Sequence, residues 1–143
     1  MIKAVKVLNL LSLLLFAAIL LLVYAFLPVE VNLNIDGFSN VNKQTLFYQL
    51  LGLFIIVNIL LQLLLKFGVG QWKESDRAWV GLLVFIVNFY LASLFGFLGV
   101  LNNASSISPD SYAYLNLIAP LLLIVWLVGL IILAFKRYFK RSH

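Results

Sequence analysis

The chain has 143 residues, of which 64% are hydrophobic and 10% are charged, and its mean hydropathy is +1.11. Soluble domains use about 45–50% apolar and about 25% charged residues, so this composition excludes an ordinary soluble fold. The sequence contains no cysteine, which excludes disulfides, thiol catalysis and thiolate metal sites.

Four apolar stretches are each longer than the roughly 18 residues that identify a membrane-spanning helix. We therefore predict an all-α integral membrane protein with one transmembrane domain over residues 1–143. The expected spans are about 6–27, 45–66, 78–101 and 113–136. The basic start of the chain also suits a signal peptide, but its apolar run is too long and lacks a small-x-small cleavage site, so the first span is expected to be retained.

The outer segment 28–44, between the first two spans, carries the pattern of a short β-hairpin. Apolar and polar residues alternate as in a half-buried strand, and Asp36-Gly37 favours a two-residue turn. In that register Val41 falls opposite Asn32, on the polar face. Three roles stay open for the segment: a cap over the chain's own helices, an edge that docks a partner, or an irregular loop. The apolar row consists of Val29, Val31, Leu33 and Ile35.

Side chains that form hydrogen bonds occupy matching positions on the second and third spans. Asn58, Gln62 and Lys66 recur every four residues and share one helix face. Asn58 and Asn88 both lie about 12–14 Å from the same membrane edge, and a short connection joins their spans, so we expect them to lie close together. The amides of Asn58, Gln62 and Asn88 form either interhelical contacts or a site for a ligand or lipid headgroup. Small and polar residues also line one face of the third span: Gly81, Asn88, Ala92, Gly96, Gly99 and Asn103.

The ten Lys and Arg residues are divided unequally between the two sides of the spans. With the N-terminus in the cytoplasm, nine lie inside and only Lys43 lies outside, as the positive-inside rule favours. We predict a multi-pass protein of the cell inner (cytoplasmic) membrane with both termini in the cytoplasm. The net charge of +5 reflects this topology, and no nucleic-acid partner is expected. Aromatic residues near span ends, Trp79 among them, are expected to mark the membrane edges. A basic cluster at the end of the last span is expected to contact anionic lipids: Lys136, Arg137, Lys140 and Arg141.

The spans lack the side chains that membrane enzymes and ion-coupled transporters use. No ionisable residue lies in the interior of a predicted span, and the single histidine is His143, the last residue. We therefore predict a protein with no catalytic residues, cofactor or metal. Its expected partners are membrane lipids and other integral membrane proteins.

A short motif follows the first span: Leu27-Pro28, then Val31, Asn34, Ile35, Asp36 and Gly37. This order resembles the SdpI-like immunity family of membrane proteins, which carry a Leu-Pro pair followed by a histidine, an aromatic residue, an Asn or Asp, and then Gly. Asn34 stands in the place of the histidine and Ile35 in that of the aromatic, and the Gly comes about two residues early. The resemblance covers about residues 24–65. It implies a bacterial inner-membrane protein that acts by binding, as in protection from a toxin or signalling to a regulator.

Three functions are compatible with these features. The first is a non-catalytic accessory or scaffold subunit of a larger bacterial inner-membrane complex, favoured by small loops and abundant aliphatic surface. The second is a stand-alone SdpI-like immunity or signalling protein that binds a peptide or protein through its first outer loop. The third is a carrier of a small molecule or lipid that uses the amide face of the second and third spans.

Overall fold

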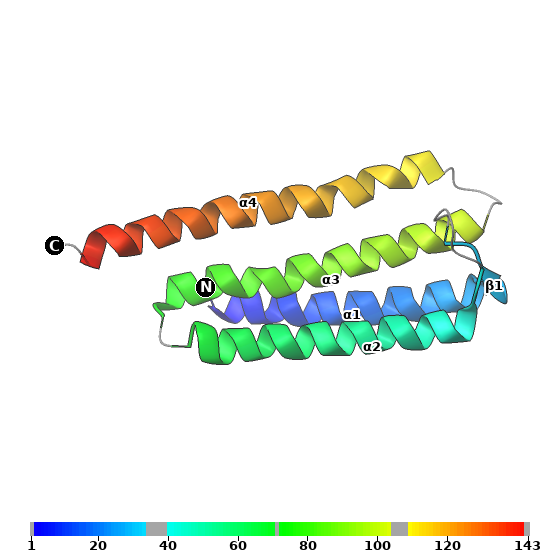
Figure 1. Ribbon diagram of the computed structural model, residues 1–143, viewed down its shortest axis with the longest axis horizontal. Helices are drawn as coiled ribbons and strands as arrows, with labels where there is room; N and C mark the ends of the chain where they lie inside the picture. Colours follow the sequence, from blue (N-terminus) through cyan, green and yellow to red (C-terminus); the bar gives the residue numbers. More distant parts are fainter. Residues whose placement is uncertain (1, 34–39, 71, 104–108, 142–143) are drawn as a thin grey trace.

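Four long helices and a two-stranded sheet make up the fold (Figure 1). The computed structural model describes residues 2–33, 40–70, 72–103 and 109–141. The helices are α1 (Ile2–Phe26), α2 (Lys43–Leu63), α3 (Glu74–Asn102) and α4 (Pro109–Arg141); a π-helical turn, η1 (Leu64–Gly68), continues α2, and the strands are β1 (Glu30–Val31) and β2 (Val41–Asn42). Each of the four helices is long and apolar enough to cross a membrane, which confirms the predicted number of such helices.

Most helix ends extend beyond the predicted spans because hydropathy marks only the apolar parts, whereas α1 ends at Phe26, one residue before its predicted end. The helix of the fourth span begins four residues early, at Pro109, and ends five residues late, at Arg141. Proline is well suited to the first position of a helix, where its missing N–H removes no hydrogen bond. The second helix continues through η1 to Gly68.

The helices alternate in direction, so the two ends of the bundle differ (Figure 1). The N-terminus, the turn between α2 and α3 and the C-terminal end of α4 lie at one end. The sheet, the end of α3 and the start of α4 lie at the other. We call the first the basic end, because Lys3, Lys66 and Lys136 lie there, and the second the strand end.

α1 and α3 run parallel and pack closely, because small residues of α3 face α1. Three contacts join residues that are each 76 positions apart: Val5 with Gly81, Ser12 with Asn88, and Val23 with Gly99. The constant separation means that the two helices lie side by side with no axial shift between the contacts. A Cβ on Gly99 would lie 2.9 Å from a methyl of Val23, so any larger residue there would push the helices apart.

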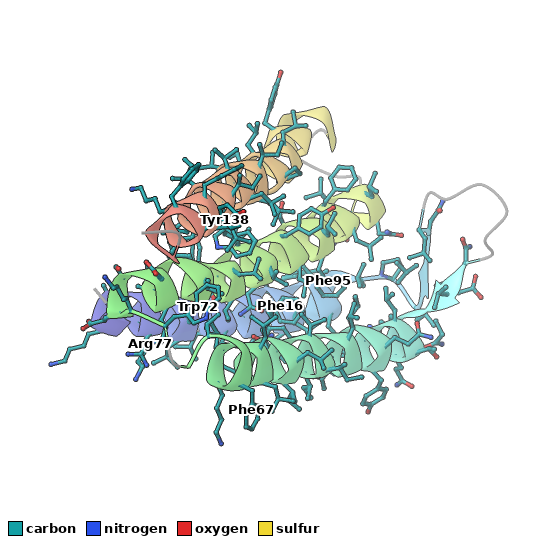
Figure 2. The ribbon with its side chains drawn as sticks, turned by 60° about the vertical axis from the view of Figure 1, so that its left-hand side comes forward. Phe16, Phe67, Trp72, Arg77, Phe95 and Tyr138 are labelled. Atoms are coloured by element: carbon teal, nitrogen blue, oxygen red, sulfur yellow. The ribbon has the colours of Figure 1, made fainter. Side chains whose placement is uncertain are left out.

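α2 lies against the same pair of helices and contributes mainly aromatic and aliphatic contacts. The rings of Phe16 and Phe54 stack with centroids 4.1 Å apart. In Figure 2, Phe16 and Phe95 lie between the helices, whereas Phe67 projects from the bundle. The core nearer the strand end consists of Phe16, Leu20, Val23, Leu27, Val31, Leu46, Ala92 and Phe95.

The hairpin pairs in a different register from the predicted one. A two-residue turn at Asp36-Gly37 requires Val41 to pair with Asn32, but Val41 pairs with Val31, and Glu30 pairs with Asn42. A shift of one residue moves a side chain to the opposite face of a strand, so this register brings Val41 onto the bundle side together with Val31. Both valines pack in the core described above, which is the physical reason for the correction. The predicted turn lies outside the described residues.

Candidate functional site: a buried amide network

The side chains of Asn58 and Asn88 form two reciprocal hydrogen bonds between α2 and α3. Asn58 Nδ2 donates to Asn88 Oδ1 at 2.8 Å, and Asn88 Nδ2 donates to Asn58 Oδ1 at 3.1 Å. Their expected proximity is therefore confirmed. Asn88 is fully buried, and Asn58 is partly buried and also donates to the Phe54 carbonyl at 2.9 Å.

α1 adds two polar residues to this pair that the sequence reasoning missed. Ser12 Oγ accepts a hydrogen bond from Asn88 Nδ2 at 3.1 Å and donates to the Asn9 carbonyl at 2.7 Å. Asn9 Nδ2 donates to the Gly81 carbonyl on α3 at 3.1 Å. The result is a polar network that joins three helices. Asn9 and Ser12 are three residues apart in a helix that is otherwise apolar between Lys6 and Tyr24, and this spacing was the signal available in the sequence.

The two central amides have little capacity left for a ligand. An amide side chain offers two donor hydrogens and one acceptor oxygen with two lone pairs. Asn88 uses both hydrogens, on Ser12 and Asn58, and its oxygen accepts from Asn58. Asn58 likewise uses both hydrogens and its oxygen. The network is uncharged and mostly self-satisfied, so its chemistry is that of a contact between helices.

Asn9 carries the one buried polar side-chain atom without a hydrogen bond among the described residues. That atom is Oδ1, and the residue is 9% exposed. A buried acceptor without a donor costs about 1–3 kcal/mol. This cost offsets part of the stabilisation from the hydrogen bond that Asn9 donates to Gly81.

Gln62 does not join the network. Its side chain is exposed on α2, and within the described residues it makes no hydrogen bond. Only two of the three amides predicted to share a site are therefore brought together.

The predicted docking row of the outer segment is split between two environments. Val31 is fully buried in the core and Leu33 packs against that core, whereas Val29 is 65% exposed. Ile35 lies outside the described residues. The positions of Val31 and Leu33 correspond to the alternative in which the segment caps its own helices.

The backbone beyond β1 is held by the end of α3. The Asn32 N–H donates to Asn102 Oδ1 at 2.8 Å, and Asn102 Nδ2 donates to the Asn32 carbonyl at 3.0 Å. Asn102 thus satisfies the two backbone groups that an added strand would need at this position. At the other side of the segment, Lys43 lies over the Tyr24 ring and donates to the Leu27 carbonyl at 3.4 Å.

Two tryptophans join α3 to α4. Trp79 Nε1 donates to the Trp126 carbonyl at 3.2 Å, and Trp126 Nε1 donates to the Trp79 carbonyl at 2.9 Å. The Trp79 ring occupies the space beside Gly129, where a Cβ would lie 2.1 Å from Cζ2. The indole N–H of Trp79, a residue expected near a membrane edge, bonds the neighbouring helix. We call this arrangement the tryptophan clamp.

The predicted lipid-binding cluster lies on the last two turns of α4. Lys136 is exposed there, and the backbone of Arg137, Lys140 and Arg141 continues the same helix. The side chains of these three arginine and lysine residues lie outside the described part of the structure.

Comparison with protein-family models, curated proteins and solved structures finds no match to this chain. The resemblance to the SdpI-like family therefore rests on its short motif alone.

Proposed function

We propose that the protein is a non-catalytic accessory subunit that acts by lateral association with other proteins of a bacterial inner membrane. The observation that carries this proposal is the closed amide network. The fully buried Asn88 and the partly buried Asn58 form their hydrogen bonds with each other and with neighbouring groups of the chain. Such a network stabilises helix packing, which leaves the outer surface as the part that meets other molecules.

The outer surface is rich in aliphatic and aromatic side chains. α2, all of which is described, has one buried side chain, Leu46. Five apolar residues of α4 each have an exposed fraction of 43–60%: Leu127, Val128, Ile131, Ile132 and Phe135. These faces suit lipid tails and apolar helices of neighbouring subunits.

The charge distribution supports the proposed orientation. The basic end carries nine of the ten cations, and Lys43 is at the strand end. The positive-inside rule places such an end in the cytoplasm. Both termini are therefore proposed to be cytoplasmic, and the hairpin to face outward.

The other two functions have weaker support. A binder that uses the outer segment needs an accessible strand, but Val31 is buried and the Asn32 backbone is bonded to Asn102. A carrier needs polar groups with unused hydrogen-bonding capacity, and Asn58 and Asn88 have little, because the N–H donors of both amides are bonded and each oxygen already accepts one hydrogen bond.

The proposal is tested by extracting the tagged protein from its native membrane in a mild detergent and measuring the mass and protein content of the particle. Foreign subunits in a constant ratio to this chain, retained after the tag is moved to the other terminus, are the expected result. A particle that contains this chain alone would refute the accessory role and favour a stand-alone binder.

A further inference from the structure

α4 is displaced along the bundle axis relative to the other three helices. The middle of α4 is Val125, next to Trp126, and the middle of α3 is Asn88. Two spans centred at the same membrane depth would bring these residues side by side. The tryptophan clamp instead joins Trp126 to Trp79, nine residues before Asn88. Nine residues correspond to about 14 Å along a helix.

The other three helices agree on a single depth. The α1–α3 contacts keep one separation along the chain, Phe16 of α1 stacks on Phe54 of α2, and Asn58 of α2 bonds Asn88 of α3. Their apolar bands therefore coincide. The basic edge of this common band is marked by Lys6, Lys66 and Arg77.

The displacement carries the end of α4 past that edge. Trp79 comes five residues after Glu74, the start of α3, so Ile131, five residues after Trp126, is level with that start. The ten residues from Ile132 to Arg141 project by about 15 Å beyond α3. Figure 1 shows this projection, in which the red end of α4 extends beyond the first turn of α3.

The projecting part continues an apolar stripe that faces away from α3. Six side chains of α4 are each 50–62% exposed and recur at alternating steps of four and three residues: Leu121, Val125, Val128, Ile132, Phe135 and Phe139. We call them the outer stripe. This spacing is the pattern by which one helix packs against another. Lipid tails of the common band reach its first part, but its last part lies beyond the basic edge.

We propose that the outer stripe docks an apolar helix of a neighbouring membrane subunit, whose acidic side chains face the cationic end of α4. This docking requires the accessory role proposed above and assigns it a surface. The stripe supplies the apolar seam, and Lys136 flanks it next to Phe135. Four cations lie in the last six residues of α4, and no acidic residue follows Asp110, so a partner with acidic residues complements this end.

The absence of cysteine from the sequence allows the stripe to be probed at single positions. Ile132→Cys and Phe139→Cys, each carrying a benzophenone maleimide, would be photolysed in native membranes, and the adducts mapped by mass spectrometry. Two control positions are used: one matches the stripe residues in exposure, and the other lies on the same helix. Ile56→Cys lies on the exposed face of α2, and Leu130→Cys lies on α4 within the cluster that packs around Trp126.

The expected result is one foreign subunit cross-linked from both stripe positions, through an apolar helix that carries acidic residues. Ile56→Cys should give lipid adducts, and Leu130→Cys should give cross-links within the chain. When Ile132→Ser and Phe135→Ser are added to the Phe139→Cys chain, the cross-link to the foreign subunit should disappear. Circular dichroism should show that this chain remains folded.

Three results would overturn the docking proposal: adducts to a second copy of this chain, adducts to lipid only, or a foreign adduct that persists after the two serine substitutions. These outcomes are distinguishable from failure of the accessory role. If the extracted particle contains foreign subunits but the stripe gives no cross-link to them, only the docking surface is wrong. A particle without foreign subunits would refute both.

Discussion

Replacing Asn88 by leucine removes the centre of the buried network. Asn88→Leu eliminates three hydrogen bonds, two with Asn58 and one with Ser12. Polar contacts between membrane helices contribute about 0.6–2 kcal/mol each, so the free energy of unfolding should fall by about 3 kcal/mol. Asn58→Leu removes the two shared bonds and should cost about 2 kcal/mol on the same basis.

The double variant Asn58→Leu/Asn88→Leu separates a hydrogen-bonded pair from two independent sites. The two shared bonds count twice in the sum of the single effects but are lost once in the double variant. The double variant should therefore be more stable than additivity implies, by about 2 kcal/mol. The assay is reversible unfolding in mixed micelles with increasing dodecyl sulfate, followed by circular dichroism.

Gln62→Leu is the matched control for this cycle, because Gln62 is an amide on the same helix that is exposed and lies outside the network. Its free energy of unfolding should change by less than about 0.5 kcal/mol. Additive effects of Asn58→Leu and Asn88→Leu, or an Asn88→Leu variant as stable as the original, would refute the structural role of the pair. Either result would return the two amides to the status of a candidate ligand site.

Three further variants test other contacts in the same assay. Gly99→Leu should separate the strand ends of α1 and α3, because Val23 leaves no room for a Cβ, and should lower the free energy of unfolding by about 1–3 kcal/mol; an unchanged unfolding midpoint would contradict this packing. Asn9→Leu should change the free energy of unfolding by less than about 1 kcal/mol, because one lost hydrogen bond is offset by removal of the unpaired Oδ1. A loss of stability as large as that of Asn88→Leu would show that Oδ1 has a partner. Asn102→Leu should release the Asn32 backbone and speed hydrogen exchange of its amide, and unchanged exchange would show that Asn102 does not hold the segment.

The sequence is sufficient to predict the features of this fold that depend on distance along the chain. The apolar lengths predict four long helices, and the short connection between the second and third fixes the relative depth of Asn58 and Asn88. Depth follows from residue counting at 1.5 Å per residue, which needs no knowledge of which helices touch.

Lateral arrangement is harder to predict because the helices are apolar on all sides. In such helices periodicity does not identify the face that meets a neighbour, as it does in a soluble amphipathic helix. The small residues of α3 suggested a close partner, but their spacing did not indicate that α1 would fill that role. Asn9 and Ser12 were missed for this reason, since they become part of the network only once α1 lies against α3.

The pairing of the hairpin strands and the alignment of α4 with α3 also depend on side-chain contacts, which cannot be predicted by counting residues along the chain. The hairpin pairs Val31 with Val41 because both valines then face the core, against the local preference of Asp36-Gly37 for a two-residue turn. Similarly, span lengths do not indicate which residues of α3 and α4 lie side by side, whereas the structure joins Trp126 to Trp79 and packs the Trp79 ring beside Gly129.

The clamp and the outer stripe have opposing energetic consequences. Two neutral hydrogen bonds contribute about 0.5–1.5 kcal/mol each. In the placement proposed above, leaving Ile132, Phe135 and Phe139 in water rather than buried costs about 1.5–3 kcal/mol per side chain when exposure is complete, or about half of this at the observed exposure. On the proposed placement, a partner that covers the stripe beyond the basic edge would favour the displaced position of α4.

This balance predicts the effect of weakening the clamp in a native membrane. Trp79→Phe/Trp126→Phe keeps two aromatic rings but removes both indole donors, so α4 should move toward the depth at which lipid covers its apolar part. The photo-cross-link from Ile132→Cys to the foreign subunit should then decrease, and lipid adducts should increase. Foreign cross-links that are unchanged in this double variant would show that the clamp does not set the depth of α4, and that the partner helix holds it there without the two indole hydrogen bonds.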